Sequence, residues 1–238
     1  MIIISIKHLS KTFGNNAVLR DIDLDLETGE FLTIFGPNGA GKTTLIKIIS
    51  TLISPTAGTV LIEGHDVKES PLEVRQLIGI ISHETYLYQD LTARENLKFF
   101  GKMYGMPKDK LESRIHELTD QVGLKYRLDD RVGTFSRGMK QRLSIARAIL
   151  HDPKILFLDE PYTGLDQHAA ATFDRILSEL DVSDKTQVMV SHDIERGLNL
   201  ADRIIILYEG KIVYQAARSE IKDIEQFRET YEYYVHEV

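Results

Sequence analysis

Apolar and polar residues alternate along residues 2–35, and the run IDLDL at residues 22–26 shows a period of two. That period is typical of half-buried strands, so we expect antiparallel β structure in this N-terminal part. A compact apolar run at residues 31–35 ends in a glycine-rich turn, and a helical pattern follows at residues 42–51. Residues 59–64 predict a further strand. The order strand, loop, helix indicates the start of an α/β core.

From about residue 85 to residue 150 the pattern changes to helical spacing, which predicts a separate helical lobe. Its apolar residues recur mostly three or four positions apart, as seen at Leu97, Phe100, Met103, Leu111, Ile115, Leu118 and Val122. Three short apolar runs then follow, at residues 155–158, 186–190 and 203–207. Such runs are typical of buried parallel strands, and a crossover helix over residues 169–180 would connect the first two. The tail from residue 219 is acidic and weakly helical in pattern.

Length and composition favour a single domain that spans residues 1–238, because 238 residues with 42% hydrophobic content can bury one large core. The net charge of −7 gives no general basic surface, so we expect no nucleic-acid partner. The absence of cysteine excludes disulfides and thiolate metal sites. No run approaches the roughly 20 apolar residues that a membrane helix needs, so we expect a cytoplasmic chain that meets a membrane only through a partner.

A glycine-rich loop between the strand at residues 31–35 and the following helix matches the pattern Gly-x4-Gly-Lys-Thr. Backbone N–H groups of such a loop and of the helix N-terminus can surround phosphate, and Lys42 adds a positive charge for the β and γ phosphates. The Thr43 hydroxyl would bind Mg²⁺. We therefore predict ATP binding by Gly36, Pro37, Asn38, Gly39, Ala40, Gly41, Lys42, Thr43 and Thr44. The alternative is a glycine-rich turn with a chance lysine.

Two acidic residues follow the apolar run at residues 155–158, at the strand end where open α/β sheets bind ligands. Asp159 is predicted to hold Mg²⁺, and Glu160 to orient or deprotonate the attacking water. The alternative interpretation of both acidic residues is a solvated turn that closes the strand. His192 follows another apolar strand and would reach the γ-phosphate from the same sheet edge, or else serve as a capping or turn histidine. Glu160 and His192 are thus the predicted catalytic residues.

Residues 135–142, with the sequence FSRGMKQR, resemble the signature motif of ATP-binding cassette (ABC) proteins, usually written Leu-Ser-Gly-Gly-Gln. Residues 161–166 resemble the D-loop of the same family, and His192 its switch histidine. The resemblance implies a P-loop NTPase core with an N-terminal antiparallel β subdomain and a helical ABC-specific subdomain. It also implies that Phe13 stacks on adenine and that Val18 binds the nucleotide.

The resemblance further implies that two copies of the chain form a head-to-tail dimer around two ATP molecules. Ser136 and Gly138 would then bind the γ-phosphate held by the other copy. Ser136 can also cap the helix that follows it, and a capped helix N-terminus is itself an anion site. Two departures from the family pattern stand in the signature: Arg137 replaces the usual first glycine, and Met139-Lys140 alters the spacing to glutamine.

A third departure lies after the predicted strand at residues 78–81, where most relatives have a glutamine and this chain has His83. Mg²⁺ prefers oxygen ligands, so His83 is expected either to contact the metal through water or to serve in coupling to a membrane partner. Gln89 is the weaker candidate for the glutamine's role, since a plain loop position explains it better.

Residues 82–100 resemble the haem-exporter ATPases of cytochrome c maturation, a subfamily that tends to carry histidine at this position. We expect an ATP-hydrolysing exporter subunit that drives integral membrane permease subunits from the inner face of the cell membrane. An exporter of drugs, lipids or polysaccharides is the leading alternative. A soluble ABC ATPase acting on ribosomes or DNA repair complexes is a further one.

Overall fold

The computed structural model describes residues 1–82, 84–163, 170–175 and 185–237, and its strands form two sheets. The first is antiparallel with the order β2-β1-β4-β5. Its strands are β1 (Ile2–Phe13), β2 (Asn16–Glu27), β4 (Ala57–Ile62) and β5 (His65–Asp66). In β2, the buried residues Ile22, Leu24 and Leu26 alternate with more exposed aspartates, as the period of two predicts, whereas register shifts interrupt the alternation in β1. The expected N-terminal antiparallel subdomain is therefore confirmed.

The second sheet has the order β10-β9-β3-β8-β7-β6 and is parallel except at β10. Its strands are β3 (Phe31–Phe35), β6 (Ile78–Ser82), β7 (Ile155–Asp159), β8 (Thr186–Val190), β9 (Arg203–Tyr208) and β10 (Lys211–Ala217). Every residue of β7 and β8 is buried, which explains the apolar runs at residues 155–158 and 188–190 in place of an alternating pattern. The predicted α/β core is confirmed.

The register of the parallel strands aligns their carboxyl ends. Asp159 pairs with Ser82 on one side and with Val190 on the other, and Val190 pairs with Ile34. The segments that follow β3, β6, β7 and β8 therefore start at the same edge of the sheet. This is the edge at which open α/β sheets bind their ligands.

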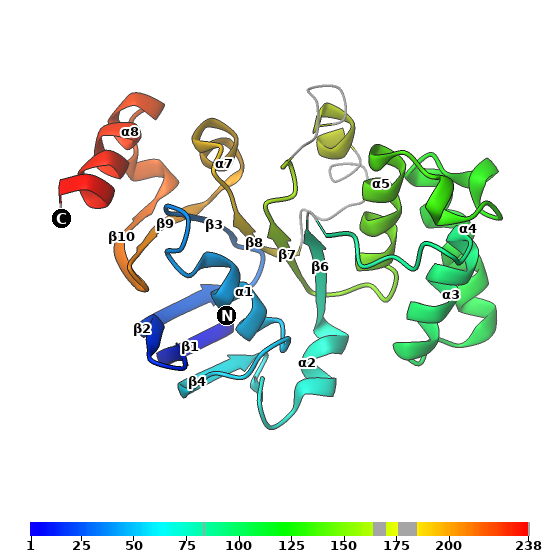
Figure 1. Ribbon diagram of the computed structural model, residues 1–238, viewed down its shortest axis with the longest axis horizontal. Helices are drawn as coiled ribbons and strands as arrows, with labels where there is room; N and C mark the ends of the chain where they lie inside the picture. Colours follow the sequence, from blue (N-terminus) through cyan, green and yellow to red (C-terminus); the bar gives the residue numbers. More distant parts are fainter. Residues whose placement is uncertain (83, 164–169, 176–184, 238) are drawn as a thin grey trace.

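A helical lobe lies at one end of the larger sheet, beside β6 (Figure 1). Its helices are α3 (Ala93–Met103), α4 (Lys108–Gln121) and α5 (Arg137–Ala148), with 3₁₀ turns at Lys125–Arg127 and Val132–Thr134. Buried residues of the lobe share one hydrophobic cluster with β6 and β7, including Leu97, Leu143 and Leu158. Met103 fits the helical spacing but is 66% exposed, because it ends α3 at the surface.

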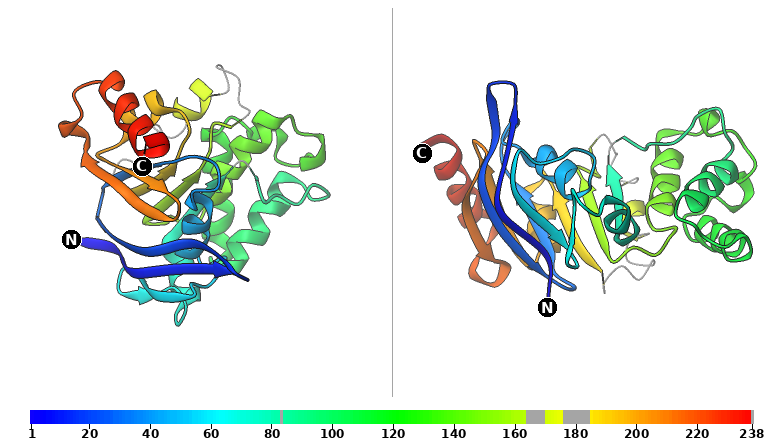
Figure 2. Two further views of the ribbon diagram at one scale, coloured as in Figure 1. Left: turned by 60° about the vertical axis from the view of Figure 1, so that its left-hand side comes forward. Right: turned by 90° about the horizontal axis from the view of Figure 1, so that it is seen from below.

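The remaining helices lie beside the two sheets and in the C-terminal part of the chain. They are α1 (Lys42–Ile49), α2 (Pro71–Leu77), α7 (Ile194–Leu200) and α8 (Ile224–Glu232), with a 3₁₀ turn at Arg218–Glu220 and a π-helical turn at Tyr233–Glu237. Figure 2 shows α8 and the chain end packed beside β10, away from the helical lobe. Within the described residues no helix is long and apolar enough to cross a bilayer.

Several predicted boundaries were wrong by a few residues, and backbone geometry gives the reason. The helix predicted at residues 42–51 ends at Ile49, because Thr51 has a left-handed φ of 62°. The strand predicted at residues 59–64 is β4, which starts earlier and ends at Ile62, because Glu63 turns the chain with a φ of 49°. Of the predicted crossover helix, residues 170–175 are helical and the remaining positions lie outside the described residues.

Candidate functional site

The glycine-rich loop connects β3 to α1 and is shaped by two close approaches of the backbone. Gly36 has a φ of 150°, and a Cβ there would lie 2.1 Å from the carbonyl oxygen of Leu207. Gly41 is the N-cap of α1 with a φ of 107°, and a Cβ there would lie 2.9 Å from the carbonyl oxygen of Val18. Only glycine fits such positions without displacing its neighbours. The loop therefore brings backbone N–H groups to the start of α1, where helix geometry favours an anion.

Lys42, the first residue of α1, folds its side chain into this loop. Its Nζ donates hydrogen bonds to the carbonyl oxygens of Gly36, at 2.6 Å, and Pro37, at 2.9 Å. Burial lowers the pKa of the Lys42 ammonium, while the negative charges of Glu160 and Asp159 act in the opposite direction. The ammonium thus lies between the loop and two carboxylates, where a phosphate would meet it.

Thr43 and Asp159 bring two oxygen ligands together across the sheet edge. The Thr43 hydroxyl donates to Asp159 Oδ1 at a distance of 3.4 Å, and Asp159 is only 7% exposed. The burial of Asp159 contradicts the alternative of a solvated turn for this residue, although a turn does follow at residues 161–163. A hydroxyl and a carboxylate at this separation fit the oxygen donors that Mg²⁺ prefers.

Both carboxylate oxygens of Glu160 have partners in the structure. Oε1 lies 2.8 Å from His192 Nε2, and Oε2 accepts a hydrogen bond from the Thr163 hydroxyl at 3.2 Å. The backbone N–H of Glu160 donates to the carbonyl oxygen of Val190, at 3.1 Å, although Glu160 has a left-handed φ of 50°. Such a conformation is costly for a residue other than glycine, and it persists because these contacts determine it.

His192 follows β8 and reaches Glu160 rather than capping the next helix. The N-cap of α7 is Asp193, whose side chain accepts a hydrogen bond from the N–H of Arg196 at 3.0 Å. The capping alternative for His192 is therefore wrong. The sheet edge places an imidazole and a carboxylate in contact, which is an arrangement that can orient a water molecule and accept its proton.

The signature residues lie on a different part of the molecule from the glycine-rich loop. Ser136 is the N-cap of α5 and accepts a hydrogen bond from the N–H of Met139 at 3.3 Å, which confirms its predicted capping role. Gly138 is half-buried in the first turn of α5, and a Cβ added there would meet no atom within 4 Å outside the helix backbone. Figure 1 shows α5 and α1 separated by the β7 and β6 end of the sheet.

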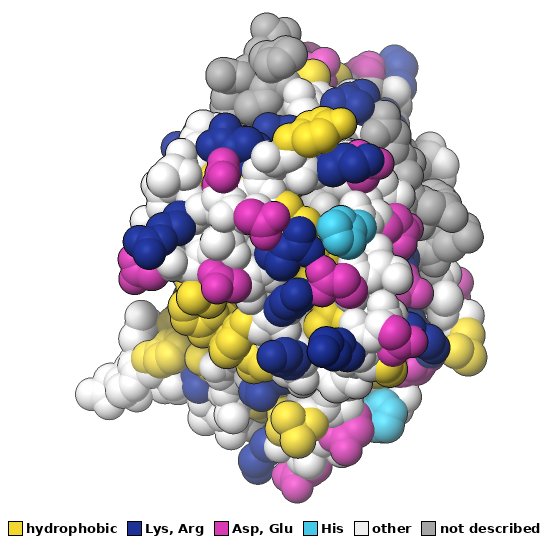
Figure 3. Space-filling model, turned by 90° about the vertical axis from the view of Figure 1, so that its right-hand side faces the viewer, with side chains coloured by type: hydrophobic (Ala, Val, Ile, Leu, Met, Phe, Trp, Pro, Cys, Tyr) yellow, Lys and Arg dark blue, Asp and Glu magenta, His cyan; other side chains and the backbone are white. Residues whose placement is uncertain are grey.

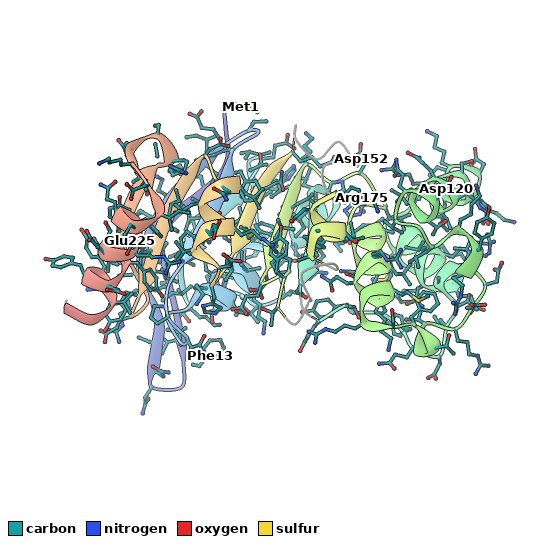
Figure 4. All side chains as sticks on the ribbon, turned by 90° about the horizontal axis from the view of Figure 1, so that it is seen from above. Met1, Phe13, Asp120, Asp152, Arg175 and Glu225 are labelled. Atoms are coloured by element: carbon teal, nitrogen blue, oxygen red, sulfur yellow. The ribbon has the colours of Figure 1, made fainter. Side chains whose placement is uncertain are left out.

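Phe13 and Val18, the residues predicted to hold the base, lie on the hairpin of β1 and β2. Phe13 is 49% exposed near the tip of this hairpin, which projects from the body of the molecule (Figure 4). The ammonium of Lys11 lies 4.8 Å from the centre of its ring. Val18 is half-buried, and its carbonyl approaches Gly41 as described above. Thr44 is half-buried on α1.

Two parts of the predicted site lie outside the described residues. These are His83 and the part of the predicted D-loop at residues 164–166. The described neighbour Ser82 ends β6 and donates a hydrogen bond to the carbonyl oxygen of Glu84, at 2.6 Å. The backbone carbonyl oxygen of Gln89 accepts a hydrogen bond from the N–H of Gly133 at 2.8 Å.

Thr163 is a site residue that the sequence analysis missed. Its N–H donates to the carbonyl oxygen of Glu160 at 3.1 Å, closing a turn that returns its hydroxyl to the Glu160 carboxylate. A signal was present in the sequence, since a hydroxyl residue stands three positions after Glu160 with Pro161 between them. Proline favours turns, and a hydroxyl at that spacing can reach back to the start of one.

The sheet edge, the glycine-rich loop and the capped signature helix agree with a family comparison. The model of the ABC transporter family matches residues 19–163, which is more than half of the chain. The chain belongs to the ABC transporter family. It is an ATP hydrolase of that family and has the fold of its nucleotide-binding subunits, with a P-loop NTPase core.

Three similar proteins support this assignment. The ABC transporter ATP-binding protein NatA of Bacillus subtilis is 39% identical over 87% of this chain and 85% of its own length. The linearmycin resistance ATP-binding protein LnrL of the same species is 34% identical over 90% of this chain and 69% of its own. A solved ATP-binding cassette, dimeric in a post-hydrolysis state with ADP and Pi, is 28% identical with a TM-score of 0.78, covering 90% of this chain and 98% of that one.

Replacing Lys42 with alanine should weaken ATP binding, because the substitution removes the one ammonium that lies inside the described part of the phosphate loop. The dissociation constant should rise at least about tenfold, the effect of one lost charge-assisted contact. Isothermal titration calorimetry with ATP measures it. Lys47→Ala is the matched control, since Lys47 is exposed on the same helix. Equal affinity of Lys42→Ala and the unaltered chain would contradict the assignment of the loop.

Proposed function

We propose that residues 1–238 form one ABC-type domain that acts as the nucleotide-binding subunit of an exporter. Two copies would close head to tail around two MgATP molecules and drive integral membrane permease subunits at the cytoplasmic face of the membrane. The observation that carries the dimer is that β7 and β6 lie between α1 and α5 of one chain (Figure 1). The signature of one copy would act on the phosphate loop of the second copy, as the resemblance to the ABC signature implies. The dimeric state of the similar cassette supports this arrangement.

Within each composite site, we assign roles from the geometry of the sheet edge. Thr43 and Asp159 would hold Mg²⁺, because their oxygens already lie together. Glu160 would accept the proton of the attacking water, and His192 would hold the carboxylate and meet the γ-phosphate. Ser136 and Gly138 of the second copy would complete the phosphate site, while Phe13 and Val18 would contact the base.

Glu160→Gln should bind ATP but hydrolyse it at least about a hundredfold more slowly, because an amide cannot accept the proton of water. Its shape is kept, so contacts from Thr163 and His192 can persist in part. The trapped ATP should hold two copies together, and size-exclusion chromatography with MgATP should show a dimer. Phosphate release measures the rate, with Glu195→Gln on α7 as the control. Near-normal hydrolysis would show that Glu160 is not the base.

A groove between the helical lobe and β6 is the proposed docking site for the permease. Its volume is about 520 Å³, and Tyr86, Leu87, Tyr88, Phe100, Tyr104, Ile78, Ile80, Leu52, Ser50, Ala148, Arg75 and Arg147 line it. Arginines are the only charged residues among these described side chains. Figure 3 shows the surface of the lobe, where side chains of both charges alternate and hydrophobic side chains gather at the lower left. An amphipathic helix with an acidic residue fits an apolar groove that carries two arginines.

The floor of this groove is held in place by buried polar contacts. Arg147 is 8% exposed, donates to the carbonyl oxygen of Ile80 at 2.7 Å, and places its guanidinium 5.2 Å from the ring centre of Phe100. Asn96 is fully buried and donates to the carbonyl oxygen of Tyr88, at 2.9 Å, while accepting from its N–H at 2.8 Å. The aromatic wall is therefore preformed, which lowers the entropy cost of binding a helix.

Leu52→Asp should weaken the complex with the permease subunits, because it places a negative charge in the groove that we assign to an acidic helix. Leu72→Asp is the matched control, since Leu72 is 69% exposed on α2 and does not line the groove, whereas Leu52 is 50% exposed. Affinity co-purification from detergent extracts of membranes should recover less permease with Leu52→Asp alone. Equal recovery with both variants would contradict the docking site. ATP hydrolysis by each isolated variant checks that the site is intact.

Haem is the first candidate for the exported substrate, because residues 82–100 resemble the haem-exporter ATPases of cytochrome c maturation. A drug, lipid or polysaccharide is the second, and the similarity to a linearmycin resistance protein favours it. The substrate pocket would lie in the permease subunits. The function of this chain is the same in either case.

Deleting the gene for this chain from its source cell distinguishes the two candidate substrates. Haem export predicts loss of c-type cytochromes, measured by haem staining of membrane fractions after electrophoresis. The second candidate predicts normal cytochromes and a greater sensitivity to the exported compound. Restoring the unaltered chain should reverse either defect, while restoring the Glu160→Gln variant should not. Normal cytochromes in the deletion strain would contradict the haem proposal.

A further inference from the structure

Two side chains near the start of α5 donate hydrogen bonds to the backbone turn that follows Glu160. Arg137 and Gln141 lie four positions apart, on one face of the helix. Arg137 Nη2 donates a hydrogen bond to the carbonyl oxygen of Thr163 at 2.8 Å, and Gln141 Nε2 donates to that of Pro161 at 3.4 Å. Arg137 is the residue that stands where the ABC signature usually has glycine, and glycine has no side chain to make this contact. The departure from the family pattern thus coincides with a specific bond.

Thr163, which accepts the hydrogen bond from Arg137, itself donates to Glu160. Its N–H donates to the carbonyl oxygen of Glu160, at 3.1 Å, and its hydroxyl donates to Glu160 Oε2 at 3.2 Å. Arg137, Thr163 and Glu160 therefore form a continuous chain of hydrogen bonds within one copy of the protein. Glu160 itself has a left-handed backbone, so the position of its carboxylate depends on the turn that holds Thr163.

The same turn is fixed on its other side by α7 and by the helical residues 170–175. The ring of Tyr162 lies 4.2 Å from the guanidinium of Arg196, and its hydroxyl donates to Asp174 at 2.6 Å. Burial raises the pKa of the Tyr162 phenol, so the hydroxyl remains a donor. The turn is held between α7 and α5, and the α5 side depends on Arg137 and Gln141.

We propose that Arg137 is a positioning residue that orients Glu160 of its own chain through Thr163. This rests on the proposed role of Glu160 as the base, and it gives the signature helix a second task besides meeting the nucleotide of the other copy. The residue acts in cis on hydrolysis, whereas the signature serine and glycine would act in trans on binding.

Arg137→Ala should lower kcat for ATP about three- to tenfold, as expected for the loss of one exposed charge-assisted hydrogen bond, and should leave KM nearly unchanged. Arg137→Lys keeps one charged donor and should recover part of the rate. Thr163→Val should show a similar loss of kcat, and Thr163→Ser, which keeps the hydroxyl, should recover part of the rate. Arg131→Ala, an exposed arginine of the same lobe, is the control. Thermal unfolding followed by circular dichroism identifies any variant that fails to fold.

A linked dimer with one active site tests whether Arg137 acts in cis. One half is unaltered, and the other carries both Lys42→Ala and Glu160→Gln, so that only the first half hydrolyses ATP. Arg137→Ala in the half with the intact Glu160 should lower kcat, and the same change in the other half should not. A loss only from the other half, an equal loss from both, or no loss from either would overturn the proposal.

The two proposals can fail separately. Near-normal hydrolysis by Glu160→Gln would overturn the proposed role of Glu160 as the base and this inference with it. An inactive Glu160→Gln together with an unchanged kcat for Arg137→Ala would overturn only the positioning role. A raised KM at an unchanged kcat would likewise overturn it, because Arg137 would then serve nucleotide binding rather than the orientation of Glu160.

Discussion

The parallel register of β3, β8, β7 and β6 is the constraint on which the site depends. Because Ile34 pairs with Val190 and Val190 with Asp159, the chain leaves all these strands at one level. The phosphate loop, the two acidic residues and His192 belong to segments far apart in the sequence, and the strand register brings these segments to one edge of the sheet. A slip of the register would separate Thr43 from Asp159, whose oxygens are only 3.4 Å apart.

Directly after β7, Glu160 adopts an unfavourable left-handed backbone conformation. The hydrogen bonds that stabilise this conformation also fix the position of the carboxylate. A left-handed backbone costs a residue other than glycine about 1–2 kcal/mol. Each net hydrogen bond contributes about 1 kcal/mol, and three bonds oppose that cost: from the Glu160 N–H to Val190, from the Thr163 N–H to Glu160, and from the Thr163 hydroxyl to the carboxylate. The conformation is therefore held with little surplus. Small changes in the turn can consequently move the carboxylate.

The residue pattern predicts most of this arrangement wherever a residue's role depends on its own segment. The phosphate loop, the buried strands and the capping role of Ser136 are encoded locally, in glycine spacing, apolar runs and a hydroxyl before a helix. Contacts between segments were not predictable. Nothing in the pattern of residues 135–142 indicates that Arg137 faces the carbonyl oxygen of Thr163, because that contact depends on how the lobe packs against the sheet. Strand and helix ends such as Ile49 and Ile62 were missed for a different reason: left-handed residues other than glycine have no strong sequence signal.

Magnitudes show how the lobe and the active site are joined. The lobe shares a core with the sheet in which Leu97, Leu143 and Leu158 are at most 1% exposed, and burying one such side chain contributes about 1.5–3 kcal/mol. The polar contacts of Arg137 and Gln141 are worth about 1 kcal/mol each. Apolar burial therefore places α5 beside the sheet, and the polar contacts at its first turn are too weak to decide that placement. The free energies of these polar contacts are comparable with the small net stabilisation of the Glu160 conformation. The contacts can therefore determine the geometry of the turn.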